Sequence, residues 1–407
     1  KEKKLNSQRE SMYLVADFAC RFFENALSST DEGKALGLTY FYERGFTDTT
    51  IKFFRLGYSP KAPDSLSTKA EKNGYNIDYL VETGLVIAKE NTSETIDRFR
   101  SRLIFPIRSM SGRIQGFGGR ILTQLKKSAK YINSPQSDIY NKSKILYGLF
   151  ESKKSIAKED SCYIVEGYTD VIQMYQSGIT NVVSSSGTAL TPDQIRLIKR
   201  LTSNIILLFD SDPAGIRAAL RGVDLILEQG INVRICTFPY GEDPDTFAKN
   251  NSNELIKQFL DENTKDFIQF KAKLLLDESK NDPINKTLIV RDIIQSISKI
   301  PDIIKQEFYL KSCSEIMGVS EDITFRAFAQ INSKIKRNQT KLRDKGLLKV
   351  PIKSSDSKKI DSKYILEKQI ISILLQYGHL EAEYEDMVIK LNEKGELIES
   401  FENIKSK

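Results

Sequence analysis

The sequence predicts an α/β fold, α+β overall, in which a central parallel sheet lies between a mixed α+β region and an all-helical region. Three observations lead to this prediction. Apolar runs alternate with helical segments between residues 161 and 250, which is typical of parallel β-α-β units. Residues 98–122 contain apolar runs around a Ser-Gly turn, as in a hairpin. Residues 253–331 have helical periodicity and no clear strand.

The N-terminal region is expected to combine short helices with this hairpin. Residues 10–27 have apolar side chains at helical spacing. Residues 33–80 are typical of short helices joined by turns. After the hairpin, residues 130–135 are expected to form a loop.

The central region has four apolar runs that we expect to be strands, with helices between them. They lie near residues 162–166, 181–184, 204–209 and 233–238. One intervening helix begins with Thr191-Pro-Asp-Gln194, a capping box with proline at the first helical position. Another is expected to begin after Asp212, which is suited to cap it. Ligands of such sheets bind beyond the carboxyl ends of the strands.

The C-terminal region is expected to contain a linker and a helical appendage. Residues 332–363 are polar and rich in lysine and serine, which predicts a flexible linker. Residues 364–377 form an apolar amphipathic segment typical of a helix, and the acidic residues after it are expected to continue as helix. A linker followed by a helical module favours a protein-docking role.

The composition excludes several classes of protein. The 407 residues are too many for one core, so about two to four domains are expected. No apolar run approaches the roughly 20 residues that cross a bilayer, and no secretory signal opens the chain, so we expect a cytoplasmic protein. The four cysteines are far apart and His379 is the single histidine, so neither a zinc site nor histidine acid–base catalysis is expected. Since the chain lacks an initiator methionine, we expect a fragment or an excised domain.

Carboxylates follow three of the predicted strands. They are Glu166 and Asp170 after the first strand, Asp210 and Asp212 after the third, and Asp243 and Asp245 after the fourth. Since the carboxyl ends of parallel strands share one edge, these side chains are expected to converge, and such a cluster repels itself unless cations fill it. Clustered oxygen ligands hold Mg²⁺ or Mn²⁺ for phosphoryl chemistry. A single Asp at a strand end is more often a helix cap, and Asp212 can take both roles, but caps alone hardly explain three acidic strand ends.

Basic residues are concentrated elsewhere, at 98–144 and 334–363, within a net charge of +7. Arginine in the first of these regions offers the bidentate fork that suits the phosphates of a nucleotide. The alternative is a solvated basic face, which is the reading we prefer for Lys126 and Lys127.

Several motifs of the chain together resemble one known family. In the central region they are Glu166-Gly-Tyr-Thr-Asp170, Ser185-Ser-Gly-Thr188, the run from Asp210 to Gly215, and Gly241-Glu-Asp-Pro-Asp245. These resemble the Toprim domain of bacterial replicative primases of the DnaG type. Upstream, the segments 98–107, 116–120, 130–135 and 145–148 resemble the polymerase core of the same family. The resemblance covers about residues 5–330 and is weaker beyond residue 364, where the chain resembles the start of the family's helicase-binding domain.

The resemblance implies an organisation in five parts. Residues 1–158 would be the basic N-terminal α+β subdomain of the primase core, and 159–250 the Toprim catalytic domain. Residues 251–331 would be a helical subdomain and 332–363 a linker. Residues 364–407 would begin the helical helicase-binding module. The family's N-terminal zinc-binding domain is not part of this sequence, and the C-terminal domain is expected to be partial.

The resemblance also implies which residues form the site. Glu166, Asp210 and Asp212 would be catalytic and, with Asp243 and Asp245, would hold two or more Mg²⁺ or Mn²⁺ ions, with Asp170 supporting the ligands. Glu166 can be a ligand, a proton acceptor or both. The nucleotide and template would be held by Arg98, Arg100, Arg120, Lys130 and Lys142, with Tyr131 stacking on a base. Arg44 matches a position near the template, although a helix-end arginine before a capping Gly45 is the alternative.

The function implied is a replicative primase that makes short RNA primers from NTPs on single-stranded DNA. Its partners would be the template, the primer and, through the C-terminal region, the replicative helicase, with a monomeric core at the replication fork and no membrane association. One alternative is another Toprim enzyme, a nuclease or topoisomerase, although none of the 17 tyrosines has a recognisable nucleophile setting. Another is a non-catalytic module that binds DNA and a helicase.

Overall fold

The structure is a computed structural model that describes residues 2–88, 95–122, 129–187, 189–209, 213–239, 241–279, 283–344, 383–391 and 397–405. Residues 1–333 form one compact unit and residues 334–407 form a second. None of the helices in these ranges combines the length and the apolar character that crossing a membrane requires.

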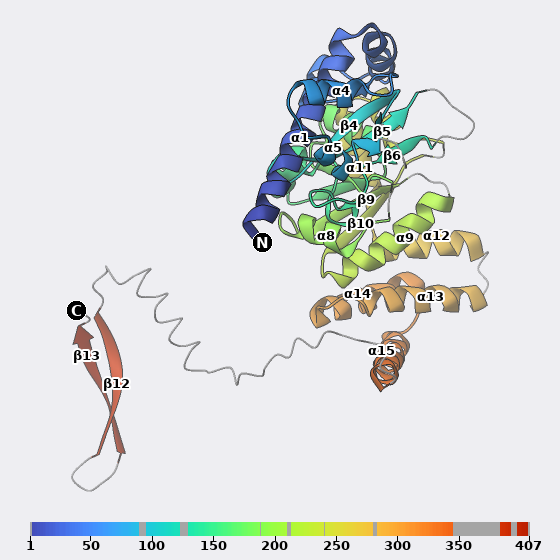
Figure 1. Ribbon diagram of the computed structural model, residues 1–407. Coiled ribbons are helices and arrows are strands. Elements are labelled where there is room, and N and C mark those ends of the chain that lie inside the picture. Colours follow the sequence, from blue (N-terminus) through green and yellow to red (C-terminus); the bar gives the residue numbers. More distant parts are fainter. Residues whose placement is uncertain are drawn as a thin grey trace. The chain divides into compact units, whose positions relative to one another are not determined.

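The N-terminal part of the first unit is an antiparallel sheet covered by a long helix. Its elements are α1 (Glu2–Ser29), η1 (Gly33–Leu38), α2 (Thr39–Glu43), α3 (Asp48–Phe53), β1 (Gly57–Ser59), α4 (Ser65–Lys72), α5 (Ile77–Glu82), β2 (Val86–Ala88), β3 (Thr95–Asp97), β4 (Arg102–Arg108), β5 (Ile114–Ile121), β6 (Tyr131–Asn133), η2 (Lys142–Lys144) and α6 (Leu149–Lys158). The sheet has the order β1-β4-β5-β6, with β4 and β5 forming the predicted hairpin. Helix α1 packs along β1 and β5 (Figure 1). A loop is predicted for residues 130–135, but β6 lies within it, because these residues pair with the edge of β5.

The central part is the predicted parallel sheet. Its elements are β7 (Cys162–Val165), α7 (Tyr168–Gln176), β8 (Val182–Ser184), α8 (Pro192–Lys199), β9 (Asn204–Phe209), α9 (Pro213–Glu228), β10 (Asn232–Thr237), α10 (Pro244–Asn250), α11 (Asn253–Asn263) and β11 (Lys265–Asp266). The order is β11-β10-β9-β7-β8, and β10, β9, β7 and β8 are parallel. The short β11 is antiparallel to β10, so the expectation of no strand after residue 253 is wrong at this edge.

One helix start within this sheet was predictable from local sequence. The hydroxyl of Thr191 accepts a hydrogen bond from the backbone N–H of Gln194 at 3.2 Å. The side chain of Gln194 in turn accepts one from the Thr191 N–H at 2.9 Å. Because Pro192 occupies the first turn and has no N–H of its own to satisfy, α8 begins as the capping box predicts.

A helical region completes the first unit. It contains α12 (Phe267–Ser279), α13 (Pro283–Ile297), α14 (Ile303–Met317) and the first half of α15 (Glu321–Asp344), a helix that continues into the second unit. Helices α13 and α14 lie side by side, antiparallel to each other (Figure 1). The prediction that a linker begins at residue 332 is wrong, since α15 continues to Asp344; the lysines, arginines and glutamine of this stretch are good helix formers.

Besides the end of α15, the described part of the second unit is a hairpin of strands β12 (Glu383–Leu391) and β13 (Leu397–Lys405), with Glu383 opposite Lys405. The helix predicted for the acidic C-terminal stretch is therefore wrong over these residues. Each segment contains three β-branched or aromatic side chains among charged residues, and Gly395 lies between the segments in the sequence, where a turn can form. The amphipathic segment 364–377 lies outside the described residues.

The N-terminal and parallel sheets share one hydrophobic core. Leu103 and Phe105 of β4 belong to the same buried cluster as Val165, Tyr168 and Leu208 of the parallel sheet and its helices. The rings of Phe105 and Tyr168 stack, with centroids 5.1 Å apart and an angle of 12° between their planes. The relative position of the two sheets is thus fixed by packing.

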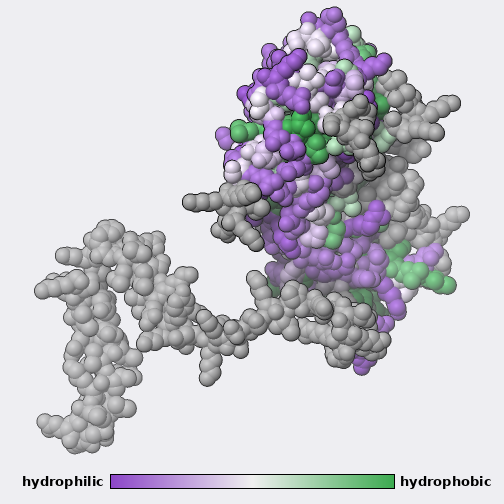
Figure 2. Space-filling view, in the orientation of Figure 1, coloured by the Kyte–Doolittle hydropathy of each residue, from purple (hydrophilic) through white to green (hydrophobic). Residues whose placement is uncertain are grey.

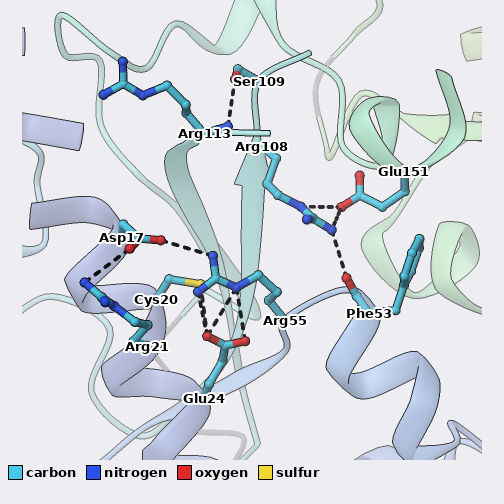
Figure 3. A network of polar contacts seen from close by, with 10 residues as sticks. All are labelled: Asp17, Cys20, Arg21, Glu24, Phe53, Arg55, Arg108, Ser109, Arg113 and Glu151. Atoms are coloured by element: carbon cyan, nitrogen blue, oxygen red, sulfur yellow. Dashed lines mark hydrogen bonds and ion pairs between the residues drawn. The ribbon is translucent and has the colours of Figure 1, made fainter. Parts of the chain in front are cut away.

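A buried ion pair adds to this packing (Figure 3). Arg108 of β4 donates from Nε to Oε1 of Glu151 in α6 at 2.7 Å, and from Nη2 to the carbonyl of Phe53 at 2.9 Å. Burial raises the pKa of Glu151, and Arg108 opposes this shift. In the same view, Arg55 joins α1 by hydrogen bonds to Glu24 and Asp17. The polar contacts of Arg108 and Arg55 therefore help to hold β4, α6 and α1 in the positions that packing of the apolar core gives them.

Candidate functional site

A cavity of about 320 Å³ lies where the carboxyl end of β7 meets the N-terminal sheet. It is lined by residues from both parts, namely Arg44, Arg120, Lys130, Tyr131, Glu166, Gly167, Tyr168, Thr169, Asp170, Ser186, Gly187, Asp243 and Asp245. Most of the residues predicted from the sequence are therefore brought to one place. The carboxylates that line it come from the parallel-sheet part, and the three cations come from the N-terminal part.

Glu166 is held at the end of β7 by its backbone. The hydroxyl of Ser184, at the end of the neighbouring strand, donates to the Glu166 carbonyl at 2.9 Å. Asp170 accepts a hydrogen bond from the Gly167 N–H at 2.8 Å and so closes the first turn of α7. The Glu166 residue itself is exposed to the cavity. Asp170 thus supports the turn that presents Glu166.

Asp243 and Asp245 line the cavity from the start of α10. Asp243 is the N-cap of this helix, and its side chain accepts a hydrogen bond from the Thr246 N–H at 2.7 Å. Asp245 is buried and forms an ion pair with Arg44, the residue at the end of α2. Both aspartates therefore have structural partners in addition to their place in the cavity wall.

Asp210 and Asp212 lie outside the described residues. The strand directly before them, β9, is hydrogen-bonded to β7 on one side and to β10 on the other and runs parallel to both. The residues that follow β7 and β10 line the cavity. The roles of Asp210 and Asp212 therefore stay a prediction from the sequence.

The fit to a divalent cation depends on the donor atoms. In the part of the chain that the structure describes, no three His, Cys, Asp or Glu side chains are grouped closely enough to hold a metal ion. The described carboxylates nevertheless share one cavity, and their oxygens are the ligands that Mg²⁺ and Mn²⁺ prefer. The donor chemistry fits these ions, and the two aspartates outside the described residues belong to the predicted ligand set.

Arg120 and Tyr131 form the opposite wall. They are paired residues on the neighbouring strands β5 and β6. Nη1 of Arg120 donates to the Tyr131 hydroxyl at 3.0 Å, and the guanidinium lies over the Tyr131 ring, 5.4 Å from its centroid. Lys130, next in the chain, is exposed. A guanidinium and an ammonium therefore face the carboxylates across the cavity.

Arg98, Arg100 and Lys142 are not among the residues that line this cavity. Arg98 is half-buried and Arg100 is exposed, in the turn that follows β3. The carbonyl of Lys142 accepts a hydrogen bond from Gln194 at 3.1 Å, which ties this residue to α8. Contact of these three with a nucleotide stays a prediction.

Arg102 is a further residue of interest that the sequence did not single out. It is buried in β4, and burial lowers its pKa. Its Nη1 donates to the carbonyl of Gly119 at 3.3 Å and to the carbonyls of Ala129 and Lys130 at 3.2 and 3.4 Å. It thereby fastens the strand ends that carry Arg120 and Lys130. Its only signal in the sequence is the alternation Arg98-Phe-Arg-Ser-Arg102.

Tyr168 links the two walls of the cavity. Its hydroxyl donates to Oδ1 of Asn133 in β6 at 2.6 Å, and Nδ2 of Asn133 donates to the Ser186 carbonyl at 3.3 Å. Burial raises the pKa of the Tyr168 phenol. Gly118 of β5 is required beside this ring, since a Cβ there would lie 2.4 Å from it. No local motif predicts these contacts, because their partners are far apart in the chain.

Three family models match successive parts of the chain. Residues 22–153 match the N-terminal domain of the DNA primase catalytic core, and residues 163–248 match a Toprim-like model. Residues 280–322 match the DnaB-helicase binding domain of primase. This match lies earlier in the chain than residues 364–407, where the resemblance implies a helicase-binding module, and it covers a segment that includes α13 and α14.

Similar proteins agree with these matches. A curated DNA primase of Halalkalibacterium halodurans is 35% identical over 335 residues, which are 82% of this chain and 55% of that protein. The crystal structure of a DNA primase domain from Pseudomonas aeruginosa has 30% identity and a TM-score of 0.71, covering 78% of this chain and 99% of that one. A DnaG primase catalytic domain solved bound to ssDNA has 29% identity and a TM-score of 0.67, covering 76% of this chain and 99% of that one. The chain spans about half the length of the curated relatives it matches.

Proposed function

Because this chain belongs to the DnaG-type family of DNA primases, we propose that it synthesises short RNA primers on single-stranded DNA by nucleotidyl transfer. The proposal depends mainly on one observation. Carboxylates at the carboxyl edge of the parallel sheet and basic side chains of the N-terminal sheet line the same cavity. Phosphoryl transfer needs both, since it depends on positioning and charge stabilisation of the phosphates.

The acidic wall would hold the divalent ions. We assign Mg²⁺ or Mn²⁺, two or more, to Glu166, Asp210, Asp212, Asp243 and Asp245. Such ions, when bound, neutralise phosphate charge and make the attacking hydroxyl more acidic. Glu166, the exposed carboxylate at the strand end, is also within the cavity where it can accept the proton of the primer 3′-hydroxyl.

The basic wall would hold the incoming nucleotide. Arg120 is oriented by its hydrogen bond to Tyr131, which leaves further guanidinium N–H groups to bind phosphate oxygens. Lys130 adds an exposed ammonium beside it. Tyr131 is already engaged with Arg120, so its main role would be to orient that side chain, with base stacking as a second role. Arg98, Arg100 and Lys142 would contact the template outside the cavity.

Helicase docking would use the helical region. Several large apolar side chains of α13 and α14 are exposed, including Ile284, Leu288, Ile304 and Phe308. Figure 2 shows hydrophobic surface at the lower right of this face, where the end of α13 lies in Figure 1. Exposed apolar surface of this kind marks interaction sites. The match to a helicase-binding model over 280–322 makes the replicative helicase the partner that we propose.

The deciding experiment measures incorporation of labelled NTPs on a single-stranded template with Mn²⁺. The expected product is alkali-sensitive RNA made by wild type and lost in Asp210→Ala and Glu166→Ala. Asp193→Ala is a matched control, because Asp193 is a surface residue of α8 paired with Arg196. Cutting or relaxation of DNA without RNA synthesis would identify another Toprim enzyme. DNA binding without either reaction would identify a non-catalytic module.

A further inference from the structure

Tyr40, in the first turn of α2, lies between two arginines of the cavity. Its ring centroid is 5.4 Å from Cζ of Arg44 and 4.7 Å from Cζ of Arg120. Arg44 follows the same helix one turn later, whereas Arg120 comes from β5. One aromatic ring therefore contacts two cations that reach the cavity from different elements.

These contacts continue on both sides of Tyr40. Arg44 is paired with Asp245 of α10, and Arg120 is hydrogen-bonded to Tyr131 of β6. The side chains are thus linked in the order Asp245, Arg44, Tyr40, Arg120, Tyr131, of which all but Tyr40 line the cavity. Tyr40 is the middle member and contacts both arginine side chains.

The electrostatics favour an aromatic residue at this position. Two guanidinium groups on one wall repel each other, and the negatively polarised face of a ring attracts a cation. Burial raises the pKa of the Tyr40 phenol, although Arg44 and Arg120 act to lower it. The side chain is therefore uncharged at neutral pH and can offset the repulsion through its ring.

We propose that Tyr40 is a positioning residue that holds the Arg120 guanidinium in the orientation that binds the triphosphate of the incoming nucleotide. This inference rests on the proposed function, which assigns Arg120 to the nucleotide. A guanidinium has five N–H donors; Tyr131 takes one of them, and the contact with the Tyr40 ring takes none. The remaining N–H groups of the Arg120 guanidinium stay available for phosphate oxygens, while the Tyr40 ring restricts the orientation of the guanidinium plane.

The test compares Tyr40→Leu, Tyr40→Phe and Tyr42→Leu. On a poly(dT) template with Mn²⁺, Tyr40→Leu should raise the KM for ATP by about 3- to 30-fold while kcat changes less than about two-fold. Tyr40→Phe keeps the ring and should stay near wild type. Tyr42 lies two residues away on the same helix, is 50% exposed and donates its hydroxyl to Asp48. Its replacement by leucine is the matched control and should leave the KM for ATP unchanged.

A further comparison separates this inference from the proposed function. Adding Tyr40→Leu to Arg120→Ala should raise the KM for ATP no further, because Tyr40 acts through Arg120. An unchanged KM in Tyr40→Leu, or an equal rise in Tyr40→Phe, would overturn the positioning role. If wild type makes no RNA at all, the proposed function fails. Calorimetric binding of ATP with Mn²⁺ then tests the inference, which predicts weaker binding in Tyr40→Leu and not in Tyr42→Leu.

Discussion

Arg44, at the end of α2, forms an ion pair with Asp245 in the first turn of α10, and this contact joins the N-terminal part to the parallel sheet across the candidate site. The Asp245 side chain is 9% exposed and that of Arg44 is 29% exposed. The pair connects a predicted template residue with a predicted metal ligand. It therefore couples the geometry of the two walls.

This pair leads to a prediction about stability. Asp245→Asn leaves Arg44 without its anionic partner and should lower the free energy of unfolding by about 1–3 kcal/mol. Urea unfolding measures this, and the double variant with Arg44→Gln completes a thermodynamic cycle. We expect the double variant to lose less stability than the sum of the single variants. Additive losses would show that the two side chains do not interact in solution.

Glu166 should be required for activity and not for stability. Since the residue is exposed and its backbone is held by Ser184, Glu166→Gln should change the free energy of unfolding by no more than about 0.5 kcal/mol. Primer synthesis should fall by about 100-fold or more. Titration with Mn²⁺ distinguishes the two roles, because a weakened metal ligand is partly restored by excess metal and a lost proton acceptor is not. Synthesis at the wild-type rate would remove Glu166 from the site.

The Arg108–Glu151 pair predicts a pH dependence of stability. Because burial raises the pKa of Glu151 above its usual 4.5, ionisation of this carboxyl is less favourable in the folded protein than in the unfolded chain. The stability contributed by the protonated Glu151 carboxyl is therefore complete below pH 4.5. It is lost as the pH rises through the raised pKa of Glu151 in the folded protein. The stability of wild type relative to Glu151→Gln should fall over that interval. Unfolding curves at several pH values check this, and a relative stability that rises with pH would contradict it.

Gly118 should not tolerate a side chain. In Gly118→Ala the new Cβ would meet the Tyr168 ring at 2.4 Å, so the ring must move and its hydrogen bond to Asn133 must weaken. We expect a loss of about 1–3 kcal/mol in unfolding free energy together with reduced primer synthesis. Tyr168→Phe removes only the hydrogen bond and should cost about 1 kcal/mol. An alanine variant as stable and active as wild type would show that the ring has room to move.

Helicase stimulation should depend on α14 and not on the C-terminal hairpin. Phe308 is 69% exposed, so Phe308→Ser should leave folding and basal synthesis unchanged while reducing stimulation by the helicase. Removal of residues 345–407 should keep that stimulation. Ile323→Ser on α15 is a matched control, since Ile323 is 58% exposed and lies just beyond the matched segment 280–322. Stimulation that survives Phe308→Ser and is lost on truncation would place docking in the C-terminal residues.

Local patterns in the sequence were sufficient for much of the fold and part of the site. The four parallel strands and the capping box at Thr191 follow from runs and spacings within a few residues. Glu166 was predictable because an apolar strand followed by Glu-Gly places a carboxylate at a sheet edge. The convergence of Glu166 with Asp243 and Asp245 then follows from parallel strand order.

Contacts between distant segments were not predictable in this way. Arg102 bonds to carbonyls of two other strand ends, and Tyr168 to Asn133, and neither pairing has a local signal. The hairpin at 383–405 was missed because acidic residues interrupt its apolar pattern. The match to the helicase-binding model over 280–322 was not anticipated either, since an amphipathic pattern alone does not tell which helices present an exposed apolar face.

The stacked rings of Phe105 and Tyr168 have a consequence for how such chains diverge. One ring belongs to the layer that supplies the cations, and the other to the turn that presents Glu166. A change in the size of either ring would shift a cation and a carboxylate relative to each other. The two layers are thus coupled through these rings, and a chimaera that exchanges one layer between relatives should fold best when the residues at positions 105 and 168 are both taken from the same parent.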